Sequence, residues 1–246
     1  MALAAAGLLT GLCLPSPIRA HTNDPGYDLF STVAGGTVFD GMNFHGVPLD
    51  TYNFGGSIGL QNVGATDTIV QRLQTVTPTG STSLQMDALQ LESVAPMFGP
   101  STYGLITLDS TPSTGTLNIN NNGTFTSTLN VYFDVCVGSL TGPIAETGEV
   151  TLSAAGDWSH NAPPEALLIP GVNYDLNGVN TSADFWPSGA GGPSTPFSET
   201  GPFDGFTETH EVGDTVPDAA STLALLLMPL GLFALAAGRE PAVCRA

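Results

Sequence analysis

The segment from Thr124 to Val137 carries the pattern that most constrains the fold of this chain. Its apolar side chains recur at every second position, at Leu129, Val131, Phe133, Val135 and Val137. The positions between them hold Asn130, Tyr132, Asp134 and Cys136. Successive side chains of a strand point to opposite faces, so this alternation predicts a strand with one buried face. The Asn120–Gly123 segment just before it predicts a hairpin turn between two Thr-rich strands.

Other segments also have strand character. Thr68–Leu73 and Glu149–Ala154 are short and contain several β-branched side chains. The alternation that begins at Leu84 shifts phase at Leu89, and a β-bulge accounts for such a shift. A short helix from Leu84 to Leu91 is the competing interpretation.

Repeated strands with turns between them predict an all-β body, a single antiparallel β-sandwich or jelly-roll-like domain over residues 21–212. Within it, residues 188–202 are rich in Gly, Pro and Ser and are expected to form a long surface loop. Residues 203–212 are expected to add a final edge strand. We expect a signal-peptide helix over residues 1–20 and a hydrophobic helix within residues 213–246 to flank this body.

The charge of the chain excludes one class of partner. Its 246 residues include 4 Lys and Arg against 22 Asp and Glu, for a net charge of −18. Three of the four basic residues, Arg19, Arg239 and Arg245, lie in the end segments, which leaves Arg72 as the one basic residue of the body. Such a body cannot neutralise phosphates, so nucleic-acid binding is excluded.

The N-terminal segment is typical of an export signal. Residues 2–14 are apolar, and Pro15-Ser16-Pro17 ends the apolar stretch. Ala20 then supplies a small residue at the expected cleavage point. We therefore expect residues 1–20 to be a signal peptide.

The C-terminal segment combines three parts in a fixed order. After a linker that begins at residue 213, a short motif occupies residues 216–222, an apolar span residues 223–238, and a weakly basic end residues 239–246. The span together with the end of the motif approaches the roughly 20 residues that cross a bilayer. Arg239 and Arg245 follow the span, and positive charge there holds that end in the cytoplasm and leaves the body outside.

This order resembles the PEP-CTERM class of exosortase sorting signals, in the variant that opens with Val-Pro-Asp. The residues that carry the resemblance in the motif are Val216, Pro217, Asp218, Ser221 and Thr222. The resemblance implies recognition by a membrane-embedded exosortase, a transient stay in the inner membrane, removal of the tail, and delivery to the cell surface or extracellular matrix. A permanent single-span anchor is the alternative. In addition, Gly46–Leu49, Asp67–Leu73 and Gly171–Tyr174 resemble parts of an uncharacterised module of bacterial exported proteins, which implies no activity.

The sequence contains no motif that by itself indicates a catalytic site. Gly55-Gly56-Ser57-Ile58-Gly59 fits the Gly-x-Ser-x-Gly pattern of hydrolases, which needs a strand before the serine and a helix after it. No helical pattern follows, so a glycine-rich turn is the preferred interpretation. His45, His160 and His210 have no metal-ligand spacing and are expected to be ordinary histidines. We therefore predict no catalytic residues and no enzyme, with a secreted hydrolase as a distant alternative.

One segment has oxygen ligands of the kind that calcium binds. Asp175 and Asn177 precede Gly178, and Asp184 follows. Alternating carboxylate and amide oxygens suit a hard cation, but the segment is too short for an EF-hand loop. An Asn-Gly turn explains the same residues without a metal. We expect no cofactor, with calcium at Asp175, Asn177 and Asp184 as the alternative.

Three aromatic residues are candidate ligand contacts. Trp158, Tyr174 and Trp186 lie in one stretch of the chain, and exposed aromatic rings on a β-domain stack on sugars. Packing in the core is the more common use of such residues. The leading hypothesis is a non-enzymatic exported cell-surface or extracellular-matrix protein. The alternative is a module that binds carbohydrate or exopolysaccharide, assisted or not by calcium.

Overall fold

The computed structural model describes residues 23–32, 37–39, 42–120, 123–160, 162, 166–173, 185–188, 194–200 and 207–214, with the backbone alone described for 37–39, 187–188, 194–200 and 207–214. Its strands are β1 (Gly26–Thr32), β2 (Thr37–Phe39), β3 (Met42–Gly46), β4 (Asp50–Asn53), β5 (Leu60–Gly64), β6 (Thr68–Arg72), β7 (Gly80–Ser93), β8 (Gly104–Leu108), β9 (Ser113–Ile119), β10 (Thr124–Val137), β11 (Ile144–Ser159), β12 (Trp186–Ser188), β13 (Ser194–Thr200) and β14 (Thr207–Asp214). The named strands pair antiparallel, and the described residues form no helix. The prediction of an all-β, antiparallel body is confirmed.

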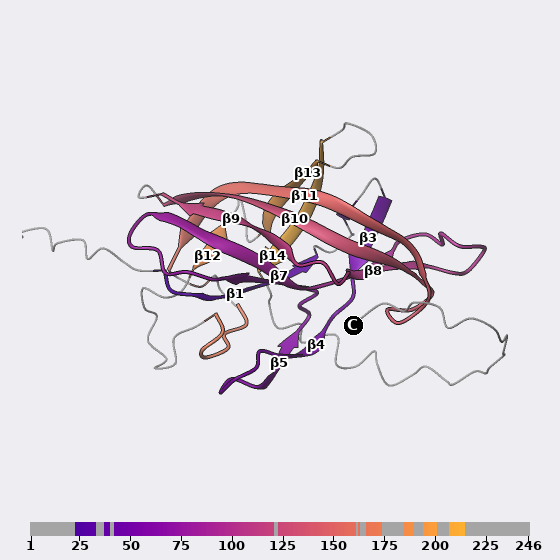
Figure 1. Ribbon diagram of the computed structural model, residues 1–246, viewed down its shortest axis with the longest axis horizontal. Coiled ribbons are helices and arrows are strands. Elements are labelled where there is room, and N and C mark those ends of the chain that lie inside the picture. Colours follow the sequence, from indigo (N-terminus) through magenta and orange to yellow (C-terminus); the bar gives the residue numbers. More distant parts are fainter. Residues whose placement is uncertain are drawn as a thin grey trace, which may run out of the picture.

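The strand pairings close on themselves. Along the ring, β7 pairs with β9, β9 with β10, β10 with β11, β11 with β13, β13 with β14, β14 with β1, β1 with β6, and β6 with β7. Figure 1 shows the long strands β10 and β11 lying side by side along one side of this barrel-like closure. Because each ring strand is bonded on both edges, few backbone groups are left without a partner.

On the edges that face each other, the long strands β7 and β10 each pair with two short strands, β8 and β9. The first part of β7, Gly80–Met86, pairs with β9, and Gln90–Glu92 pairs with β8. On β10, Phe125–Asn130 pairs with β9 and Phe133–Val137 with β8. The strands β8 and β9 therefore lie end to end between β7 and β10.

The two larger hydrophobic clusters lie on opposite faces of the sheet. The larger one gathers the inward side chains of the ring, among them Leu89 and Leu91 of β7 and the predicted alternating face of β10, of which Leu129, Val131, Phe133 and Val135 are buried. Burial of each such side chain stabilises the fold by about 1.5–3 kcal/mol. The predicted outward face of β10 is also covered near its end, since Cys136 is buried with Leu105.

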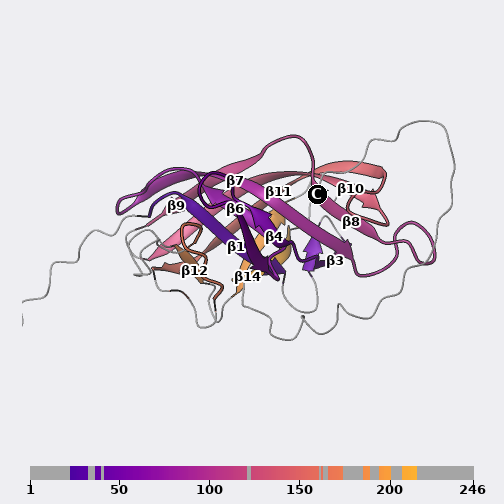
Figure 2. The same ribbon diagram turned by 90° about the horizontal axis from the view of Figure 1, so that it is seen from below.

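The second cluster lies on the outer face of β1, β6 and β7. It contains Leu29, Ile69 and Ala88 from these strands, together with Val63 of β5 and Ile169 and Val172. The β4–β5 hairpin and the segment 166–173 cover this face. The hairpin projects below the ring in Figure 1, and in the view from below in Figure 2 β4 lies over the ring. The hairpin forms a separate two-stranded sheet, so side chains rather than sheet hydrogen bonds hold it against the ring.

The phase shift in β7 is a β-bulge. Ile69 pairs with Ala88, but Val70 pairs with Met86, so Asp87 has no residue directly opposite on β6. The bulge prediction is confirmed, and the competing helix over 84–91 is wrong. The extra residue restores the alternation, because it returns Leu89 to the inner cluster while Ala88 packs in the outer one.

Several predicted boundaries need correction. The strand predicted at 149–154 extends over Ile144–Ser159, since it pairs along the length of β10. Part of the predicted loop 188–202 is the strand β13. The predicted edge strand at 203–212 is present as β14, but it is not an edge, because it pairs with β13 on one side and with β1 on the other.

The one basic residue of the body is buried. The side chains of Arg72 and Asp28 are 2% and 8% exposed, and Arg72 Nε donates to Asp28 Oδ2 over 3.1 Å. Arg72 Nη1 also donates to the carbonyl oxygen of Asp24 over 2.7 Å, and the guanidinium lies 5.4 Å from the centre of the Phe185 ring. Burial raises the pKa of Asp28, although the charge and hydrogen bonds of Arg72 act in the opposite direction.

Candidate ligand groove

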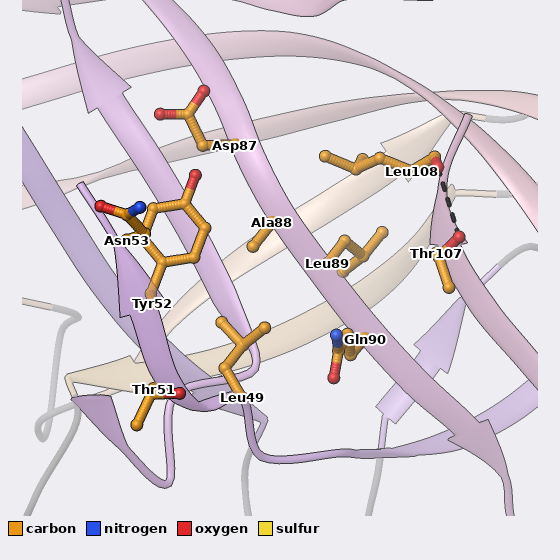
Figure 3. Close-up of a pocket in the computed structure, with 10 residues that line it drawn as sticks. All are labelled: Leu49, Thr51, Tyr52, Asn53, Asp87, Ala88, Leu89, Gln90, Thr107 and Leu108. Atoms are coloured by element: carbon orange, nitrogen blue, oxygen red, sulfur yellow. Dashed lines mark hydrogen bonds between the residues drawn. The ribbon is translucent and has the colours of Figure 1, made fainter. Parts of the chain in front are cut away.

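A groove of about 400 Å³ opens between the β4–β5 hairpin and the ring. Figure 3 shows Tyr52 and Asn53 of β4 on one side, Thr107 and Leu108 of β8 on the other, and the β7 residues Ala88, Leu89 and Gln90 between them. Asp87, Leu49 and Thr51 complete the lining. A hollow of this volume is within the range of small-molecule sites.

The local sequence explains why β4 stands over β7. Val63 points from the hairpin into the outer cluster and is fully buried. Leu49 anchors the start of the hairpin, where its amide donates to the Thr66 carbonyl over 2.7 Å. Asp50 follows with a φ of 58°, a left-handed conformation that redirects the chain into β4. The small side chain of Ala88 leaves space beneath the strand.

Three aromatic rings form a wall beside the groove. The Phe54 ring contacts Tyr27 at 4.8 Å and Tyr52 at 4.9 Å between centroids, both edge-on. The hydroxyl of Tyr27 accepts a hydrogen bond from Gln71 Nε2 over 3.1 Å. Edge-on contacts of this kind stabilise and orient the rings. Tyr52 is therefore held at the groove by packing.

The bulge residue Asp87 supplies the charge of the groove. Its carboxylate accepts a hydrogen bond from Gln85 Nε2 over 2.8 Å, and partial burial raises its pKa. Burial and then the negative charge of Asp87 raise the pKa of Tyr52 to about 12. Figure 3 shows the Tyr52 hydroxyl on the side of the ring that faces Asp87. The two groups thus form an aromatic and acidic end of the groove.

The predicted ligand aromatics lie elsewhere. The Trp158 ring stacks on Phe185 at 5.5 Å, and Trp186 is 6% exposed. Phe185 also contacts Phe125 of the inner cluster. Trp158 and Trp186 thus share in packing at one end of the ring, and their ligand role stays a prediction. Tyr174 lies outside the described residues.

The predicted hydrolase motif forms a hairpin loop. Ser57 is exposed in the turn between β4 and β5, and Gly55, Gly56 and Gly59 have φ values of 73°, 53° and 66°. Glycine adopts this region without steric cost, which explains the pattern. A strand follows the serine where the hydrolase geometry needs a helix, so the preferred turn interpretation is confirmed.

The histidines are dispersed. His45 is half-exposed and lies 3.5 Å from Glu92. His160 packs edge-on against Trp158 with centroids 5.0 Å apart. His210 lies in β14, where it is paired with Phe197. Within the part of the chain that is described, no group of three or more His, Cys, Asp or Glu side chains is placed to hold a metal ion.

Several predicted residues lie outside the described ranges. They are Ala20, Val216, Pro217, Asp218, Ser221, Thr222, Arg239, Arg245, Asp175, Asn177 and Asp184. Among the residues that are described, no helix has the length and apolar character needed to span a membrane. The signal peptide, the sorting tail and the calcium segment stay predictions.

Comparisons with protein-family models, curated proteins and solved structures found no match to this chain. The groove residues Tyr52, Asn53, Asp87 and Gln90 were not predicted as a site. The phase shift in β7 was a signal for Asp87, since bulges redirect side chains. The sequence has no comparable signal for the hairpin that completes the groove.

Proposed function

We propose that this chain is a non-enzymatic exported cell-surface or extracellular-matrix protein that an exosortase-type enzyme releases from its C-terminal tail. The single observation that carries the proposal is the order of the tail, in which the motif at 216–222 precedes an apolar span at 223–238 and the basic residues Arg239 and Arg245. As part of this proposal, the body is a single β-sandwich or jelly-roll-like domain between a signal-peptide helix and a hydrophobic tail helix.

The test is cell fractionation with mass spectrometry of the chain, in hosts with and without an exosortase. With the enzyme, the surface or medium fraction contains a chain that begins after Ala20 and lacks the span at 223–238. Without it, the full tail remains in the membrane fraction. An intact tail on surface-exposed protein from the exosortase host contradicts processing and supports a permanent anchor.

Variants test whether processing of the tail depends on the motif itself or on a general effect on export. Pro217→Ala combined with Asp218→Ala should leave the tail attached and move the chain to the membrane fraction. Asp214→Ala, which removes a carboxylate just before the motif, is the matched control and should be processed like the unaltered chain. Equal processing of both variants would show that the Val-Pro-Asp motif is not read.

A second function, the binding of carbohydrate or exopolysaccharide, is favoured by the groove beside Tyr52. Hydroxyl and amide side chains of Thr51, Asn53, Gln90 and Thr107 line it together with an aromatic ring, a combination suited to a polyhydroxylated ligand. A glycan-array screen of the full chain tests this function, and repetition with a calcium chelator tests assistance by calcium. Retention of no glycan would contradict it.

A further inference from the structure

The acidic end of the groove contains a partly buried carboxylate, and no basic side chain lines the groove to neutralise it. Asp87 is a bulge residue, and it lines the groove beside Ala88. A carboxylate offers about four acceptor positions. In the described part of the chain, one hydrogen bond from Gln85 serves this carboxylate. Its remaining acceptor positions are available to a donor that enters the groove.

No basic side chain lies among the residues that line the groove. Arg72 is the one Lys or Arg among the described residues, and its guanidinium is buried against Asp28 and the Asp24 carbonyl. Two neutral side chains lie toward Asp87: the Gln85 amide donates to its carboxylate over 2.8 Å, and the Tyr52 hydroxyl is on the side of its ring that faces it (Figure 3). A carboxylate that has lost water without gaining a cation favours a positively charged ligand.

The other side chains that line the groove limit the chemical class of ligand that it can bind. Aromatic rings attract cations, and the Tyr52 ring lines the groove on the same side as Asp87. Beyond them, Thr51, Asn53 and Gln90 offer both donors and acceptors, which a ligand with several hydroxyl groups can satisfy. The net charge of −18 also raises the local concentration of cations and lowers that of anionic polymers.

We propose that the groove binds amino-sugar glycans that carry free ammonium groups, with the ammonium paired to Asp87 beside the Tyr52 ring. Thr51, Asn53 and Gln90 hydrogen-bond the sugar hydroxyls. This inference rests on the proposed glycan-binding function and specifies its ligand. N-acetylated sugars, which have lost the positive charge, and uronic acids, which are negative, bind more weakly.

The test is isothermal titration calorimetry of the purified full chain at pH 6, where the glucosamine amines are mostly protonated, and low salt, with three tetrasaccharides of the same linkage. They are the β-1,4-linked tetramers of glucosamine, N-acetylglucosamine and glucose. One charge-assisted hydrogen bond contributes about 1.5–3 kcal/mol, so the glucosamine tetramer should bind at least about tenfold more tightly than the other two. The preference should shrink with added salt.

Variants assign the preference to Asp87. Asp87→Asn keeps the shape and an acceptor for Gln85 but removes the charge, so the three tetramers should bind with similar affinity. Tyr52→Ala should weaken all three. Glu146→Gln is the matched control, because Glu146 is an exposed carboxylate on β11 away from the groove lining, and it should leave the preference intact. Unchanged thermal melting curves show that each variant is folded.

The outcomes distinguish the inference from the function on which it rests. If the three tetramers bind equally well and Tyr52→Ala abolishes binding, the ammonium inference is overturned and glycan binding stands. If Asp87→Asn retains the preference for glucosamine, the assigned site is wrong. If no tetramer binds while a lysine peptide binds in an Asp87-dependent way, the ligand class is wrong. If nothing binds, both proposals fail.

Discussion

Removal of the Arg72 guanidinium should be among the most damaging single changes to the stability of this domain. Arg72→Met keeps most of the aliphatic stem, but it leaves the Asp28 carboxylate, 8% exposed, without its counter-ion. It also removes the 2.7 Å hydrogen bond to the Asp24 carbonyl. Breaking a buried ion pair from one side costs about 3–5 kcal/mol. That is a large share of the 5–15 kcal/mol by which typical domains are stable.

Urea denaturation at pH 7 followed by circular dichroism measures this loss, provided that the slope of the transition is unchanged. His45→Met is the control, because it removes a half-exposed polar contact with Glu92 and should cost less than about 1 kcal/mol. The double variant Asp28→Leu with Arg72→Met should recover most of the stability, since it removes both buried charges.

The dependence on pH provides a second check on the same reasoning. Burial already raises the pKa of Asp28, and loss of Arg72 raises it further. A carboxyl whose pKa is raised by folding stabilises the fold most in its protonated form, and this contribution is lost as pH increases. The cost of Arg72→Met should therefore be smaller at pH 4 than at pH 7. A cost below about 1 kcal/mol at pH 7, or one that grows on acidification, would refute this account.

Two further predictions concern stability. Burial raises the pKa of Asp67 from 3.8 to about 6, so Asp67→Asn should gain stability relative to the unaltered chain between pH 4 and pH 7, by about 2 kcal/mol in urea titrations. A difference independent of pH would contradict this. Gly115→Ala would place a Cβ against the backbone of Thr128 and should cost about 1–3 kcal/mol, whereas the exposed Thr114→Ala should be nearly neutral in thermal melts.

The local patterns determined much of the fold. The alternating face of β10 is visible in the sequence because its side chains meet a dry interior on one side. The bulge in β7 is also visible, since an extra residue must shift the phase of any strand that keeps a buried face.

Other features depended on partners that are distant in the chain. The strand β13 contains Pro196 and follows a Gly-rich stretch, so its local sequence favours a loop. It becomes a strand because β11 and β14 offer it hydrogen bonds on both edges. The same pairing changes β14 from an edge strand into an interior one. Strand identity here is set by the neighbours rather than by propensity.

The groove also combines residues that are visible in the sequence with an arrangement that depends on distant contacts. The sequence contains Asp87 and Tyr52, but it has no pattern that brings a bulge and a separate hairpin together. That meeting depends on Val63 and Leu49 packing against Ala88 and Ile69 in the outer cluster.

By itself, the sequence determined the all-β class and the acidity of this protein, because periodicity and charge are local properties. From the tail it also led to the prediction of export. The closure of the ring, the burial of the body's one basic residue and the groove at Asp87 were decided by the tertiary structure. Each depends on which segments far apart in the chain become neighbours, and hydrophobic burial and strand pairing decide that only for the chain as a whole.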